Sequence, residues 1–258
     1  MIQFNSPVEA FLHWEKTKPD QPFLLQPING KLIRYTYKEA GVEIRKVAAK
    51  LKGFGFPKKS HIALLSKNCA HWQMSDLAIM MAGYVSIPIY PTLLAETIEQ
   101  VLTHSESKAI IVGKVDQYES KKAGIPDIPI LGIQLYGIKE PESWEDAISK
   151  ELEISTINYP AFSDLHTIIY TSGTTGSPKG VMHTVGNFMN SIQTIGDIIN
   201  LPDNPTFFSY LPLAHVAERL IWTFALSLGP QIRYPETLDS FASDLEATQP
   251  NVFFAVPR

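Results

Sequence analysis

The residues with the clearest capacity for chemistry lie in one short run, Tyr170 to Gly180, which reads YTSGTTGSPKG. The run holds five Ser or Thr hydroxyls, three glycines and one lysine, Lys179, and it follows an apolar stretch typical of a strand. Glycines let the backbone approach an anion, hydroxyls add hydrogen-bond donors, and a lysine supplies a mobile positive charge. These residue types in this order predict a loop that binds a triphosphate.

The spacing differs from that of a Walker A loop. Pro178 stands where that motif has its second glycine, and Gly180 stands where it has Ser or Thr. Kinase and GTPase functions are therefore less favoured. A flexible surface loop is the simpler alternative for a Gly/Ser/Thr-rich run, but it gives no reason for a lysine fixed between a proline and a glycine.

The run resembles the signature phosphate loop of the adenylate-forming (AMP-binding) superfamily, which includes acyl-CoA synthetases, luciferases and the adenylation domains of peptide synthetases. The resemblance includes the uncommon Gly-x-Pro-Lys-Gly ending. It extends to residues 85–112, expected to form a strand, a helix and a strand without chemistry, and to FFAVPR at 253–258. The segment YLPLAHVAER, residues 210–219, is most similar to long-chain fatty acyl-CoA synthetases and is expected to line the acyl pocket.

This resemblance implies ATP-dependent activation of a fatty acid through acyl-AMP to acyl-CoA, with ATP, Mg²⁺ and coenzyme A as the small molecules used besides the acid. Pyrophosphate leaves in the first step, so donors and cations are needed where its charge develops. The predicted phosphate-binding residues are Thr171, Ser172, Gly173, Thr174, Thr175, Gly176 and Lys179. The predicted catalytic residues are Lys179, Thr175 and His215.

Family members place the adenine, ribose and magnesium contacts and a catalytic lysine after the segment that FFAVPR resembles, so the 258 residues are expected to be an N-terminal part, inactive alone. Other carboxylate substrates (acetyl, aryl or amino acid) remain alternatives within the enzyme class. A fragment that binds phosphate or an acyl chain without turnover is the alternative outside it.

His215 opens an apolar helical pattern, in which a histidine is most often structural, but the resemblance implies that it lies beside the carboxylate and gates the passage between the acyl pocket and the thiol tunnel. The same pattern fits one wall of an acyl tunnel, with Ala225 and Ala217 as its small residues, and the alternative is that Ala225 lies on a core face. Glu218 and Arg219 read most simply as a solvated face of this helix, with a role for Arg219 in holding the helix end as the alternative.

Composition agrees with a globular enzyme. The chain has 45% apolar and 19% charged residues and a formal net charge of -4, which disfavours nucleic acid as a partner. Its one cysteine, Cys69, fits a reducing, cytoplasmic compartment, and the histidines lack metal-ligand spacing, so no metal site is predicted. No apolar run is long enough to cross a bilayer, whereas peripheral membrane association stays open. The oligomeric state is not predicted.

Helical and strand patterns alternate along the chain and predict an α/β fold with mostly parallel sheets covered by helices. Strands are expected at 61–65, 85–89 and 108–112, and an Asn29-Gly30 hairpin turn precedes them. A Pro- and Glu-rich span after Gly137 is expected to hold a short helix from Pro141 and a connection into a second sheet. The predicted subdomains are residues 1–160 and 161–258, the second holding the phosphate loop and the start of an incomplete unit.

Overall fold

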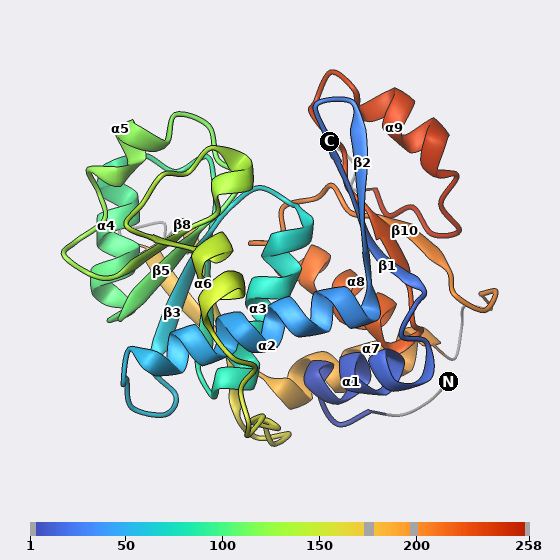
Figure 1. The fold of residues 1–258 in the computed structure, drawn as a ribbon, viewed down its shortest axis with the longest axis horizontal. Helices are drawn as coiled ribbons and strands as arrows, with labels where there is room; N and C mark the ends of the chain where they lie inside the picture. The colour runs from blue at the N-terminus through green and yellow to red at the C-terminus, as the bar shows by residue number, and fades with distance from the viewer. Residues whose placement is uncertain (1–3, 173–177, 197–200, 256–258) are drawn as a thin grey trace.

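Two β-sheets organise the chain, with strand orders β7-β6-β5-β3-β4-β8-β9 and β10-β11-β1-β2 (Figure 1). The computed structural model describes residues 4–172, 178–196 and 201–255. The strands are β1 Pro22–Ile28, β2 Lys31–Thr36, β3 His61–Leu65, β4 Val85–Ile89, β5 Ala109–Val112, β6 Ile130–Gly132, β7 Glu142–Ser143, β8 Leu165–Ser172, β9 Pro178–Thr184, β10 Thr206–Phe208 and β11 Gln231–Arg233. The helices are α1 Pro7–Thr17, α2 Tyr37–Gly53, α3 Ala70–Ala82, α4 Ala95–His104, α5 Tyr118–Lys122, the 3-10 helix η1 Gln134–Tyr136, α6 Trp144–Lys150, α7 Val185–Gly196, α8 Val216–Ser227 and α9 Phe241–Thr248.

The seven-stranded sheet is parallel from β7 to β8, and only β9 runs antiparallel to its neighbour. Alternate residues of its strands enter two separate apolar clusters: Ala63 and Leu65 of β3 pack with α4, while Ile62 and Leu64 pack on the face that α2 and α3 cover. Burial on both faces explains why the sequence of these strands is a continuous apolar run. The predicted α/β class with mostly parallel sheets is confirmed.

Helix starts follow the local signals in the sequence. Thr36 caps α2: its Oγ1 accepts from the backbone N–H of Glu39 at 3.2 Å, and the Glu39 carboxylate accepts from the backbone N–H of Thr36 at 2.8 Å. This reciprocal pair is a capping box, a pattern that Thr36 followed three residues later by Glu39 favours in the sequence. The hairpin turn is also confirmed, because Asn29 and Gly30, with φ of 50° and 71°, join β1 to β2.

Helix α3 lies between the two sheets and is buried on every side (Figure 1). It contacts β1 of one sheet and β3 and β4 of the other. Its buried positions include four polar side chains, His71, Gln73, Ser75 and Asp76, so polar groups lie at the centre of the molecule. Within the described part of the chain, no helix is long and apolar enough to cross a membrane.

The span after Gly137 departs from the prediction. Helix α6 begins at Trp144 because the hydroxyl of Ser143 accepts from the backbone N–H of Asp146 at 3.0 Å, which moves the start beyond Pro141. The strand that follows this span, β8, pairs with β4 in the same sheet and does not enter the second one. Both sheets thus combine strands from either side of residue 160, and the division into two subdomains there stays a prediction.

Candidate active site

The hairpin of β8 and β9 carries the predicted phosphate loop. Thr171 faces Lys179 across the two strands, and Ser172 faces Pro178. Directly opposed residues of an antiparallel pair project from the same face of a sheet. Thr171 and Lys179 are both exposed, so a hydroxyl and an ammonium group leave the same face at the base of the loop. The remaining predicted phosphate-binding residues, Gly173, Thr174, Thr175 and Gly176, lie outside the described residues, and their roles stay predictions.

Tyr170 anchors the end of β8 to helix α4. Its hydroxyl lies 2.7 Å from Nδ1 of His104, and the two rings meet edge to face at 5.6 Å. Burial raises the pKa of the Tyr170 phenol. Gly180 lies opposite Tyr170, and a Cβ there would lie 2.7 Å from Cγ2 of Ile168 and 3.1 Å from Cζ of Tyr170. The last glycine of the motif therefore serves the packing of this ring.

His215 is the N-cap residue of α8, as the sequence predicts for the start of this helix. Its Nδ1 accepts a hydrogen bond from the backbone N–H of Ala217 at 3.2 Å, and its ring is exposed. Because Nδ1 is an acceptor, Nε2 is the ring nitrogen that carries a proton in the neutral tautomer. Nε2 is thus free to donate to a group outside the helix.

Thr171 and His215 line one cleft of about 600 Å³. The cleft lies where β4 and β8 end, and in open parallel sheets ligands bind at the carboxyl ends of the strands. The lining residues are Tyr90, Thr92, Leu93, Thr97, Gln100, Val101, Tyr170, Thr171, Pro178 and His215. Among the described residues that line it, none is Asp, Glu, Lys or Arg. The cleft itself is neutral, and Lys179 lies beside it on the hairpin.

Residues Tyr90 to Val101 form a wall of the cleft that the sequence analysis did not predict, because it assigned no site residue to the strand, helix and strand of 85–112. The signal that could have found this wall is the position of Tyr90 and Thr92 directly after a buried parallel strand. The neighbouring strand in the sheet, β8, leads into the phosphate loop, so its end and that of β4 had to lie close together.

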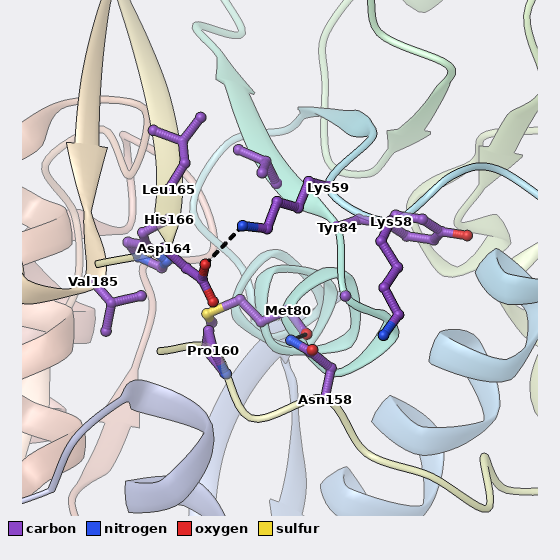
Figure 2. Close-up of a pocket in the computed structure, with 12 residues that line it drawn as sticks. Lys58, Lys59, Met80, Tyr84, Asn158, Pro160, Asp164, Leu165, His166 and Val185 are labelled. Carbon is purple, nitrogen blue, oxygen red and sulfur yellow. Dashed lines mark hydrogen bonds and ion pairs between the residues drawn. The ribbon is translucent and has the colours of Figure 1, made fainter. Parts of the chain in front are cut away.

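A second pocket lies at the opposite ends of the same strands (Figure 2). It is lined by Val85 and Leu165, the first residues of β4 and β8, and an ion pair of 2.9 Å joins Lys59 to Asp164 beside it. Its volume is about 50 Å³, which is too small for a nucleotide or an acyl chain. The cleft at the carboxyl ends is therefore the candidate active site.

Glu218 and Arg219 are not a solvated face, so that prediction is wrong. Glu218 is 3% exposed and Arg219 is 0% exposed. The hydroxyl of Ser209 donates to Oε1 of Glu218 at 2.6 Å, and burial raises the pKa of Glu218 to about 8 despite this bond. Helix α8 packs against neighbours on both its apolar and its charged sides.

Replacing Glu218 by glutamine is expected to raise the melting temperature at pH 9 by about 5 °C and to change it little at pH 4. The carboxyl titrates near its ordinary 4.5 in the unfolded chain and near 8 in the folded one, so folded stability falls as the pH rises between these values. Glutamine keeps a side-chain oxygen that accepts from the hydroxyl of Ser209, and it does not ionise, so the fall in folded stability with rising pH is avoided. Thermal denaturation from pH 4 to 9 measures the effect, with the exposed Glu246→Gln as control. A difference that does not vary with pH would contradict the assignment.

Ala225 does not line the cleft. It is 1% exposed and packs in the core beside Phe207, Trp222 and Ile232, around a void of only about 10 Å³. The described structure therefore places Ala225 in the core of the second sheet, which supports the core alternative over the acyl tunnel. Ala217, in the first turn of α8, is half-buried.

The chain belongs to the AMP-binding enzyme family, whose model matches residues 11–258. Long chain acyl-CoA synthetase 5 of Arabidopsis thaliana is 31% identical over 265 residues, which cover 89% of this chain and 38% of that protein. The chloroplastic long-chain-fatty-acid–[acyl-carrier-protein] ligase AEE15 of the same plant is 28% identical and is matched over 92% of this chain and 36% of its own length. The chain thus spans well under half the length of these relatives.

Solved structures support the fold. The N-terminal domain of FACL13 from Mycobacterium tuberculosis superposes with a TM-score of 0.79 at 21% identity, covering 94% of this chain and 60% of that domain. The complex of VinN with L-aspartate superposes equally well, with a TM-score of 0.79 at 15% identity and coverage of 95% and 60%. At 21% and 15% identity these likenesses show the fold, and the fold alone does not identify the carboxylate substrate.

Proposed function

We propose that this chain forms the phosphate-binding and acyl-gating part of a long-chain fatty acid–CoA ligase. The observation that carries the proposal is the cleft that brings Thr171, at the base of the phosphate loop, and His215, at the start of α8, into one lining. A ligase of this kind needs the phosphates of ATP and the carboxylate of the acid in one place. The similarity to long-chain acyl-CoA synthetases supports the choice of acid.

The chemistry assigns a different task to each side of the cleft. A carboxylate is a poor acyl donor until one oxygen attacks the α-phosphate of ATP, which gives acyl-AMP and expels pyrophosphate. Lys179 and Thr171, with Ser172 and the loop residues after it, stabilise the charge on the β- and γ-phosphates. Preorganised donors are effective here because they need not rearrange when the charge develops.

The neutral lining fits the uncharged part of the substrates. Leu93, Val101 and Pro178 offer apolar surface, and Thr97 and Gln100 offer hydrogen-bonding groups. His215, with Nε2 available, lies where it can contact the acid group and gate the arrival of the thiol of coenzyme A. Among the described lining residues there is no carboxylate to bind Mg²⁺, so the metal would enter as the counter-ion of ATP.

Cellular placement follows from the same proposal. A single buried cysteine fits a reducing compartment, and we propose a cytoplasmic enzyme that associates with membranes at their surface when it takes up its acid. Attachment at the surface would be compatible with a chain that lacks a membrane-crossing helix in its described part.

The proposal is tested by exchange of labelled pyrophosphate into ATP. The complete protein is expected to show exchange that depends on palmitate and Mg²⁺, followed by thioester formation when coenzyme A is added. The 258 residues alone are expected to show none, because by resemblance the adenine and ribose contacts lie in the part of the relatives that this chain does not cover. Exchange driven by acetate, benzoate or an amino acid instead of palmitate would contradict the proposed fatty-acid substrate. Thioester formation on acyl carrier protein alone would contradict coenzyme A as the acceptor.

A further inference from the structure

Arg219 is fully buried at the centre of the molecule, where it contacts three other elements, α3, β8 and α7. Its Nη2 lies 3.1 and 3.2 Å from the two carboxylate oxygens of Asp76 in α3 and 3.0 Å from Nε2 of His166 in β8. Its guanidinium also lies 5.2 Å from the ring of Trp72 and 5.9 Å from that of Phe188. One side chain of α8 thereby joins α3 and β8.

The contact with His166 fixes the state of that ring. Burial, and then the charge of Arg219, lower the pKa of His166 to about 3, so the imidazole is neutral. Arginine has only donors, so Nε2 of His166 must accept and Nδ1 must carry the proton. The link between α8 and β8 is therefore a directional hydrogen bond from a charged donor, of the stronger kind.

This arrangement is a costly way to stabilise a core. Nε and Nη1 of Arg219 are buried without a hydrogen-bond partner among the described residues, and so is Nδ1 of His166. Buried ion pairs often contribute less to stability than well-packed apolar residues of the same volume, and unpaired buried donors add to the cost. Apolar side chains of the same volume could give the core more stability. The benefit of the Arg219 network is therefore the fixed positions of the elements that it joins.

Arg219 joins α8 and β8, which place His215 and Thr171 in the lining of the candidate active site, to α3, the helix that precedes β4. The backbone N–H of Arg219 donates to the carbonyl of His215 at 3.2 Å, one turn away in α8. His166 lies in the strand that ends at Thr171 and Ser172, and α3 leads directly into β4, which ends next to Tyr90. A shift of any of these elements would change the width of the cleft.

We propose that Arg219 is a positioning residue, which through Asp76 and His166 fixes the separation of His215 from the phosphate-loop hairpin. The catalytic consequence of this role rests on the proposed ligase function. The separation itself does not, because it is a distance between α8 and the β8–β9 hairpin that can be measured without any substrate.

The separation is tested with a pair of nitroxide labels in the 258-residue chain. Cys69 is its one cysteine and is buried, so labels can be placed at Ala217→Cys in α8 and Val181→Cys, an exposed site in β9. Electron paramagnetic resonance then reports the distribution of distances between the two elements. The parent is expected to give one narrow distribution.

Two variants break the network in different ways. Asp76→Asn with Arg219→Met removes both charges together, so that no buried ion is left unpaired, and His166→Phe removes only the link to β8. Both are expected to broaden the distribution about twofold or more, and the melting temperature of the double variant is expected to stay near that of the parent. Thr223→Val is the matched control, because Thr223 is buried in α8 but donates only to the carbonyl of Arg219 within its own helix, at 2.8 Å.

The outcomes separate positioning from a merely structural role. A parent-like distribution in both variants, or in His166→Phe alone if the double variant does not fold, would overturn the proposal, and so would equal broadening in Thr223→Val. In the complete enzyme, His166→Phe is expected to lower kcat for pyrophosphate exchange by about 10- to 100-fold with KM values nearly unchanged. If the parent shows no exchange, the proposed function fails while the distance measurement still decides the role of Arg219.

Discussion

Replacing Lys179 by alanine in the complete enzyme is expected to lower the rate of acyl-AMP formation by about 10- to 1000-fold, the scale of losing one electrostatic contact to a transition state. Lys179 projects from the same face of the hairpin as Thr171, beside a cleft whose described lining holds no Lys or Arg. Stabilisation of the charge that builds up on pyrophosphate is therefore expected to depend strongly on the ammonium group of Lys179. Single-turnover formation of acyl-AMP and release of pyrophosphate measure the effect.

Lys58→Ala is the matched control for this prediction. Lys58 is also exposed, but it lies beside the small pocket at the opposite ends of β4 and β8 (Figure 2). The control is expected to leave acyl-AMP formation unchanged, because the two sites are separated by the length of the strands. Unchanged pyrophosphate release in Lys179→Ala, or an equal loss in both variants, would remove Lys179 from the catalytic set.

Local signals in the sequence were sufficient for most of the elements. The bounds of β3 and β4 agree with the expected strands 61–65 and 85–89, because each is a short apolar run buried on both faces. The start of α2 follows from Thr36 and Glu39, which contact each other across three residues. Such features depend on neighbours close in the sequence, and propensity and pattern report on them directly.

The environment of α8 could not be predicted from local signals in the sequence. Arg219 contacts Asp76, 143 residues away, and His166, 53 residues away, and no periodicity within α8 indicates those partners. Charged side chains in a helix are most often solvated. Arg219 is buried here because α3 supplies the carboxylate of Asp76, and Glu218 is buried with a hydrogen bond from Ser209. The wall of the cleft was missed for a related reason, because it depends on which strands are neighbours in the sheet.

Ala225 shows how contacts between residues distant in the sequence change an expectation about substrate choice. The sequence places a small residue in an apolar helix, which suits either a tunnel wall or a tightly packed core. In the structure its methyl group faces Phe207 and Trp222 around a void of about 10 Å³, and the residues that line the 600 Å³ cleft do not include it. A larger side chain at this position therefore has no space to enter and would meet the core, not a substrate.

Ala225→Trp is accordingly expected to destabilise the protein by about 3 kcal/mol through overpacking, which lowers the melting temperature by roughly 5 to 10 °C. The ratio of specificity constants for C8 and C16 acids in the complete enzyme is expected to stay unchanged. Ala217→Trp is the matched control on the same helix, where the half-buried position can accept a ring with a much smaller loss of stability. A preference shifted toward C8 in Ala225→Trp, with the melting temperature preserved, would show instead that this face of α8 contacts the acyl chain. A filled tunnel would exclude methylene groups, and each excluded methylene loses about 0.8 kcal/mol of transfer free energy.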